Sequence, residues 1–337
     1  MAKAIFISGD CWLCVFDLLP PRQLGLGIAL ISHRFDVYVD EHFKTRKWTL
    51  GIIEIRSKMG ENGTKKMEIV IYEWEPLPIP KIQLPRKVIG FGRIEICYID
   101  QNAIAFLHHF RQLFTKCSIN LSIKAYNDRS SELILRNIWP MIVKNIHGIE
   151  LSAKFFRRLR QFVPSILNDC PSLGIVKFRD PVNFFIEFPA DDSAAASDGQ
   201  VVAKWLFTAL PNNVPKVFKC VLEMDYVNLA STIDAFKTAF ASASSPANFI
   251  VVVWFYRSPL AFSIAPFGLI NELTREQLTL KKINNGRRFV FVRCPIARDE
   301  NKWAKWEEKA IVWQTYEFNR IAIYLLLDEM LGPIDHY

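Results

Sequence analysis

The sequence lacks an apolar run long enough to cross a membrane. Its longest runs, residues 249–255 and 321–327, fall far short of the roughly 20 residues that a spanning helix needs. The first dozen residues hold one lysine and no apolar stretch of the length found in signal peptides. These absences predict a protein without a membrane partner, located in the cytoplasm or the nucleus.

Recognised catalytic motifs are also missing. The glycine pairs Gly25/Gly27 and Gly90/Gly92 lack the third glycine of a dinucleotide-binding loop. There is no GxxxxGK[ST] phosphate loop, HExxH zinc helix or GxSxG nucleophile turn. We therefore expect no enzyme and no cofactor, although a site assembled from distant residues would leave no local motif.

Cysteine is sparse and scattered. The seven cysteines are odd in number and spread over the chain, which favours reduced thiols over a disulfide framework. Cys11 and Cys14 have the spacing of metal ligands, but no second pair completes a set of four. We expect them to be ordinary helix residues that bind no metal.

What the sequence does have is enough apolar content for a large core. It is 337 residues long, 50% hydrophobic and 13% aromatic, which exceeds one ordinary domain. Its net charge is +8, and residues 275–309 hold ten bases against five acids. This local excess makes nucleic acid, or another acidic partner, an alternative ligand class to consider.

Residues 10–48 predict a helical hairpin followed by a polar helix. Asp10 stands at an N-cap position before apolar residues at helical spacing, Trp12, Leu13, Phe16 and Leu19. Pro20 and Pro21 end this helix, and Pro21 can begin the next one. A unit of about 40 residues buries too little apolar surface to be stable alone. Its apolar surplus therefore needs a partner or the rest of the chain.

This order of residues resembles the F-box, the helical motif by which substrate adaptors of cullin-RING ubiquitin ligases dock on the Skp adaptor subunit. The paired apolar residues of the first helix, the apolar residues after the prolines, and Ser32 followed by Phe35 stand at motif spacing. The family's opening Leu-Pro-x-Glu is Ser8-Gly9-Asp10-Cys11 here, and its third-helix Trp would be Phe35. The residues that the resemblance assigns to Skp-adaptor binding are Trp12, Leu13, Val15, Phe16, Leu19, Pro20, Leu24, Leu26, Ile31 and Phe35.

The resemblance implies an adaptor that holds a protein substrate near a ubiquitin-conjugating enzyme, with the Skp adaptor and, through it, a cullin scaffold as partners. Segments 39–51 and 292–310 also resemble parts of one expanded group of animal F-box proteins. The alternative is that the N-terminal unit is purely structural.

The chain divides into three predicted parts: an F-box-like unit (1–48), a hairpin with a proline-rich connector (49–90), and an α/β region (91–337). The hairpin would pair residues 49–55 with 67–74. Beyond it, strands are predicted at 94–99, 119–125, 149–152, 173–178, 216–222 and 249–256, alternating with helices at 102–116, 154–162, 201–209 and 229–242.

Part of the α/β region repeats. Residues 139–151 line up with 163–175 at a shift of about 24, within the range of leucine-rich repeats. Each copy has a proline, a short helical turn and then alternating apolar residues. We predict an irregular leucine-rich-repeat-like β/α region that binds the substrate, with an ordinary layered α/β domain as the alternative.

The last predicted feature is a basic hairpin. Residues 278–283 and 288–293 flank Asn284-Asn285-Gly286, a strong hairpin signal. Its cations, Lys281, Lys282, Arg287 and Arg288, are candidates for gripping an acidic or phosphorylated substrate. Alternatively they keep a strand edge from pairing. The following predicted helix, 299–315, places Trp303, Trp306 and Trp313 on one face, for core packing or for binding.

Overall fold

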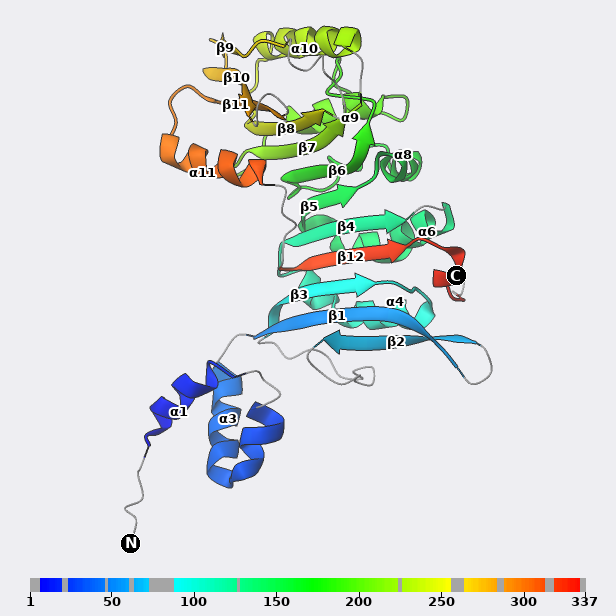
Figure 1. Cartoon of the computed structure of the whole chain (residues 1–337), viewed down its shortest axis with the longest axis vertical. Coiled ribbons are helices and arrows are strands. Elements are labelled where there is room, and N and C mark those ends of the chain that lie inside the picture. Colours follow the sequence, from blue (N-terminus) through cyan, green and yellow to red (C-terminus); the bar gives the residue numbers. More distant parts are fainter. Residues whose placement is uncertain are drawn as a thin grey trace.

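The computed structural model describes residues 7–19, 24–45, 48–60, 64–72, 88–125, 128–223, 226–255, 264–283, 288–312 and 318–333. Within these ranges no helix is both long and apolar enough to span a membrane. The protein is of the mixed α/β class, as the sequence predicts, and its strands form one twelve-stranded sheet (Figure 1).

The strands are β1 (Trp48–Met59), β2 (Lys65–Tyr72), β3 (Val88–Ile96), β4 (Ile119–Ala125), β5 (Ile146–Leu151), β6 (Ile175–Val182), β7 (Lys216–Leu222), β8 (Phe249–Phe255), β9 (Phe267–Asn271), β10 (Glu276–Ile283), β11 (Arg288–Pro295) and β12 (Arg320–Leu325). Their order across the sheet is β2-β1-β3-β12-β4-β5-β6-β7-β8-β11-β10-β9. From β1 to β8 neighbouring strands are parallel, whereas β2 at one edge and β11, β10 and β9 at the other are antiparallel.

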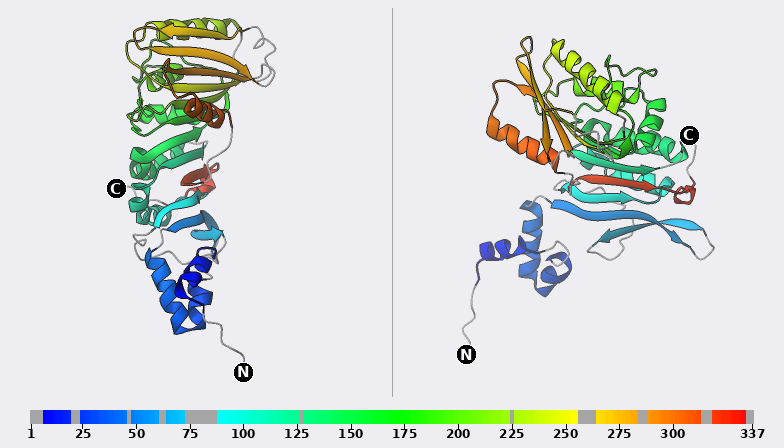
Figure 2. Two further views of the ribbon diagram at one scale, coloured as in Figure 1. Left: turned by 90° about the vertical axis from the view of Figure 1, so that its left-hand side faces the viewer. Right: turned by 45° about the horizontal axis from the view of Figure 1, so that its top comes forward.

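The helices of the sheet region are α4 (Gln101–His109), α5 (Arg111–Phe114), α6 (Asp128–Leu133), α7 (Trp139–Ile142), α8 (Ala153–Phe162), α9 (Asp198–Leu206), α10 (Tyr226–Ala241) and α11 (Glu300–Ile311). Short irregular turns accompany them at η3 (Ile134–Ile138), η4 (Val143–Asn145) and η6 (Asp328–Met330). Figure 2 shows α11 on the opposite side of the sheet from α8 and α10.

Alternation along the strands separates the two faces of the sheet. Phe249, Val251 and Val253 of β8 point into the large core that α4 to α10 cover. Ile250 and Val252, one position along, belong to a smaller core under α11 with Trp303. Side chains along each strand therefore alternate between the two faces, and among the described helices α11 packs on the second face.

The N-terminal unit has a small core of its own. It consists of α1 (Gly9–Phe16), the π-helical turn η1 (Leu24–Ile28), the 3-10 turn η2 (Ala29–Ile31) and α3 (His33–Thr45). Among the described residues, Phe16, Leu24 and Val39 are its buried apolar side chains, and the Trp12 and Phe35 rings pack edge to face at 4.8 Å. The unit extends away from the β1 side of the sheet (Figure 1).

Several predicted boundaries need correction. Ser8, not Asp10, caps α1, because its side chain accepts the N–H of Cys11 at 3.4 Å. The second predicted helix is a π turn and a 3-10 turn, and the diproline before it lies outside the described residues. The predicted helix 102–116 breaks at Phe110 into α4 and α5. Strands 119–125 and 216–222 are confirmed to the residue.

The hairpin of residues 49–72 is part of the main sheet. β1 pairs with β2 as predicted, and it also pairs in parallel with β3, so this segment continues the sheet of the α/β region. The proline-rich connector itself, 73–87, lies outside the described residues.

The two copies of the predicted repeat have different structures. A helical turn, α7, precedes β5, whereas residues 164–169 before β6 form turns.

Candidate functional site

Most residues assigned to Skp-adaptor binding form the inside of the N-terminal unit. Phe16 and Leu24 are fully buried, and Trp12, Leu13, Leu19 and Phe35 pack against them. Val15 and Ile31, in contrast, are 42% and 63% exposed. Pro20 and the side chain of Leu26 lie outside the described residues. The helical spacing in the sequence thus marks chiefly the face that holds the unit together.

The same unit exposes apolar residues that the prediction left out. Leu18 is 84% exposed, Leu30 76% and Val37 51%. Leu18 lies in the turn after α1, Leu30 in η2 and Val37 in α3. In the sequence, they can be recognised as large apolar residues at positions outside the three-to-four spacing of the core residues. Together with Val15 and Ile31 they form what we call the exposed apolar set.

The basic hairpin is present, but two of its cations contact residues of α11. β10 and β11 pair as predicted, with Ile283 opposite Arg288. Lys281 contacts Glu307 of α11 at 2.8 Å between Nζ and Oε2. The Arg288 guanidinium lies 3.9 Å from the Trp254 ring centroid and donates to the carbonyl oxygen of Ile311 at 3.0 Å. Lys282 lies over the Phe289 ring, and Arg287 falls outside the described residues.

Trp303 of the tryptophan stripe is used for packing. It is buried in the core between α11 and β8, and Trp306 packs edge to face on it at 5.3 Å. Trp313 lies outside the described residues.

A charged pocket lies on the second face of the sheet, beside the stretch that α11 covers. In the parallel strands β12, β4, β5, β6 and β7, residues of equal register stand side by side about 4.8 Å apart. One such row reads Ala322, Ser122, Glu150, Lys177 and Lys219. The pocket is small, with a cavity volume of about 30 Å³, and Arg320 and Asn120 also line it.

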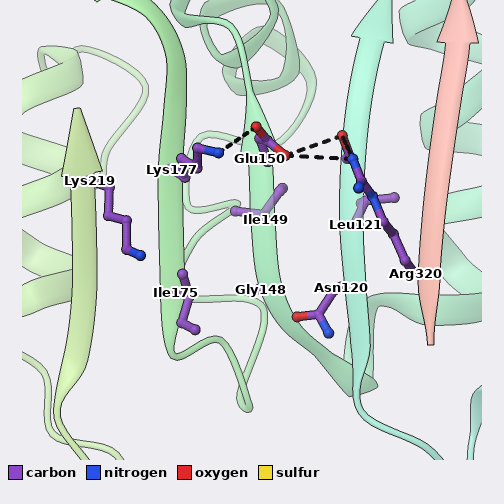
Figure 3. Close-up of a pocket in the computed structure, with 10 residues that line it drawn as sticks. Asn120, Leu121, Gly148, Ile149, Glu150, Ile175, Lys177, Lys219 and Arg320 are labelled. Atoms are coloured by element: carbon purple, nitrogen blue, oxygen red, sulfur yellow. Dashed lines mark hydrogen bonds and ion pairs between the residues drawn. The ribbon is translucent and has the colours of Figure 1, made fainter. Parts of the chain in front are cut away.

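Glu150 stands at the centre of the pocket (Figure 3). Its Oε1 lies 2.8 Å from Lys177 Nζ and 3.7 Å from Arg179 Nε, and its Oε2 lies 3.8 Å from Arg320 Nη2. Burial alone would raise the pKa of Glu150, but these cations, Lys177 first, hold it below its ordinary value. The carboxylate is therefore charged at neutral pH.

The two arginines meet at Ser122. Arg179 donates to Ser122 Oγ at 2.9 Å, and Arg320 donates to the same oxygen at 3.3 Å. These bonds hold both guanidinium groups beside Ser122, although Arg179 belongs to β6 and Arg320 to β12, far apart in the sequence.

Lys219 completes the cation set. It is buried, and its Nζ donates to the carbonyl oxygen of Val312 at 2.8 Å, next to the carbonyl that Arg288 binds. A cation at the carboxyl end of α11 is favoured by the helix dipole. Burial, followed by repulsion from Lys177 and Arg288, lowers the pKa of Lys219 to about 8. Lys219 therefore stays mostly protonated at pH 7.

The arrangement can hold an anion. Lys177, Arg179, Lys219 and Arg320 carry four positive charges around one carboxylate, in a setting where charges are partly shielded from water. Within the described ranges no group of His, Cys, Asp or Glu could hold a metal ion. The sequence could not reveal this pocket, because its residues come from five different strands.

Comparison of the chain with protein-family models, with curated proteins and with solved structures finds no match. Its function is therefore argued from the geometry above and from the resemblance of its N-terminal residues.

Proposed function

We propose that the protein is a substrate-recognition adaptor that docks through its N-terminal unit on the Skp subunit of a cullin-RING ubiquitin ligase. The observation that carries the proposal is the exposed apolar set, Val15, Leu18, Leu30, Ile31 and Val37, on a small unit that already has its own core. The resemblance to the F-box supplies the identity of the partner.

The energetics favour a partner for this unit. Fully burying one Leu or Ile side chain contributes about 1.5–3 kcal/mol. Several large apolar side chains exposed on one small unit are candidates for an interaction site. Because the unit extends away from the sheet, the exposed apolar set stays accessible to another protein (Figure 1).

The sheet region would present the substrate. Strands β4 to β8 follow one another in chain order and are all parallel, which supports a leucine-rich-repeat-like arrangement. The insertion of β12 and the antiparallel strands β9 to β11 distinguish it from a regular solenoid.

The mechanism is proximity rather than bond chemistry. Tethering turns the encounter between a substrate lysine and the charged ubiquitin-conjugating enzyme into an intramolecular event at a high effective concentration. The adaptor needs one surface for the ligase and another for the substrate. The exposed apolar set and the charged pocket are two separate surfaces of these kinds.

The test is coexpression of the full chain with a Skp adaptor, followed by gel filtration. We expect comigration in a one-to-one complex, and loss of the complex in Leu30→Asp/Ile31→Asp. These positions are better targets than Phe35, whose replacement would disrupt the unit itself. The matched control is Leu273→Asp, equally exposed at 75% but beside the far edge strand β9.

Absence of comigration for the unaltered chain would refute the proposal. So would equal loss of the complex in the Leu273→Asp control, because that residue lies outside the N-terminal unit.

The alternative function is a basic protein that binds nucleic acid, or another acidic partner, without assembling a ligase. Its support in the structure is the cation set of the pocket. Against it, Lys281 and Arg288 of the basic hairpin are engaged by α11 rather than extended along a surface. Binding to nucleic acid would fall steeply with salt concentration, whereas docking of apolar side chains would not.

A further inference from the structure

We propose that the pocket around Glu150 binds a carboxylate or phosphate group on a segment of another protein. The inference rests on the proposed function in one respect, that this segment would belong to the substrate. The pocket and its chemistry stand independently of the N-terminal unit.

The first argument is the excess of positive charge. Lys177, Arg179 and Arg320 lie within 4 Å of one carboxylate, Glu150, and Lys219 lines the same pocket, so the cluster has three more positive than negative charges. All four cations are less than one-quarter exposed. Partial burial strengthens the attraction between such a cluster and an incoming anion.

The second argument is that both arginines hold Glu150 loosely. Charge-assisted N–H···O bonds are normally about 2.7–2.9 Å long. Arg179 Nε and Arg320 Nη2 lie 3.7 and 3.8 Å from the carboxylate, whereas Lys177 lies at 2.8 Å. Glu150 therefore pairs chiefly with Lys177, and the guanidinium groups of Arg179 and Arg320 can still donate to a second acceptor.

The third argument is an unsatisfied donor. Arg320 Nε is buried and has no hydrogen-bond partner. Such a group costs about 1–3 kcal/mol, more when it is charged, until an acceptor reaches it. An oxygen of a bound carboxylate or phosphate would supply that acceptor, and the planar fork of arginine suits both anions.

The surroundings favour a peptide over nucleic acid. On the β3 side, the row of Glu150 continues through Ala322 to Glu95 and Glu54. A nucleic-acid backbone carries a charge at every phosphate and would meet these carboxylates. A peptide with one or two acidic groups would not.

The experiment is fluorescence anisotropy of labelled short peptides with the full chain at fixed salt. The probes are a peptide with two glutamates, a peptide with one phosphoserine and, for comparison, the first peptide with glutamine in place of both glutamates. We expect binding of one or both acidic peptides, weakened about tenfold or more in Arg179→Gln/Arg320→Gln. The control Arg56→Gln/Lys58→Gln removes two cations from β1, where both pair with Glu68, and should leave affinity unchanged.

A second variant separates binding from folding. Glu150→Gln removes the competing carboxylate, so acidic peptides should bind more tightly even if the variant is less stable. A structural role for Glu150 alone would give no such gain.

Weakening by the β1 control equal to that by Arg179→Gln/Arg320→Gln, or no gain with Glu150→Gln, would overturn the proposal. Tighter binding of a single-stranded oligonucleotide than of either acidic peptide, lost in Arg179→Gln/Arg320→Gln, would replace the peptide with nucleic acid. Comigration with the Skp adaptor should persist in every pocket variant. If the unaltered chain does not comigrate with the Skp adaptor, the adaptor function is refuted, but the anion-binding role of the pocket is not.

Discussion

Two buried lysines on β7 couple the stability of the protein to pH. Lys216 donates to the carbonyl oxygen of Trp205, and Lys219 donates to that of Val312. Burial lowers the pKa of both ammonium groups from 10.5 to about 8. The unfolded chain keeps these protons to a higher pH, so the charged lysines cost stability below pH 8. That cost is relieved as pH rises above about 8.

Buried thiols act in the opposite direction at higher pH. Burial raises the pKa of Cys97 and Cys117 from 9.0 to about 11, and that of Cys170 to about 12. Above pH 9 the unfolded chain loses these protons while the folded chain keeps them. The free energy of unfolding therefore falls as pH rises through this range.

We expect the free energy of unfolding to rise between about pH 8 and pH 9 and to fall beyond it. Urea denaturation at a series of pH values measures this. Lys219→Met should reduce the rise, because one of the two depressed lysines is gone. A steady fall from pH 7 upward in the unaltered chain would contradict the expectation.

At this scale the sequence predicts which residues are candidates for a site better than it predicts which of them come together in the fold. Lys281 and Arg288 could be identified in the sequence because they lie beside an Asn-Gly turn. Their contacts with Glu307 and with the end of α11 could not. The pocket residues give no local signal, since Ser122 and Arg320 are 198 positions apart.

Among the elements, the N-terminal unit depends on very few buried residues. Phe16 contacts both Trp12 and Phe35, with ring centroids 6.4 and 6.5 Å apart. Removing a buried Phe side chain costs about 3–5 kcal/mol. A unit with so small a core has little stability to lose.

Phe16→Ala should therefore unfold this unit and leave the sheet intact. Limited proteolysis should cut the variant within its first 48 residues while the rest stays protected. The control is Val15→Ala, on the same helix but 42% exposed, which should stay resistant. Simultaneous loss of protection across the sheet would show that the unit and the sheet unfold together.

Element types were predictable from periodicity wherever the apolar pattern is local. Strand β4 matches its predicted limits because its apolar residues alternate, and β7 begins as predicted because Pro215 stands before its apolar run. η1 and η2 were not predictable, because an apolar segment after two prolines does not distinguish an α-helix from π and 3-10 turns.

In the whole molecule, β12 joins two parts of the sheet that the sequence presents separately. It lies between β3 and β4 and is parallel to both, with Arg320 opposite Arg93 on one side and Asn120 on the other. Apolar residues at 321, 323 and 325 predict a strand or a short helix, but nothing in them specifies the two neighbours. Strand order depends on contacts distant in sequence, which local patterns do not encode.

Truncation tests this role. A chain ending at residue 318 lacks β12 and leaves β3 and β4 with unpaired edges in the middle of the sheet, so we expect loss of cooperative unfolding and aggregation. A chain ending at residue 333 retains β12 and should behave as the full chain does. Circular dichroism with gel filtration makes the comparison, and a native thermal transition in the shorter chain would exclude the central role of β12.

The place of β12 also sets the timing of folding during synthesis. A ribosome adds about 5–20 residues per second, so ~10–40 s separate the emergence of β4 from that of a strand 198 positions later. Throughout that interval β3 and β4 have exposed edges that would pair with any other strand nearby. The nascent chain should therefore require a chaperone until its last strand arrives, and slower translation would lengthen that dependence.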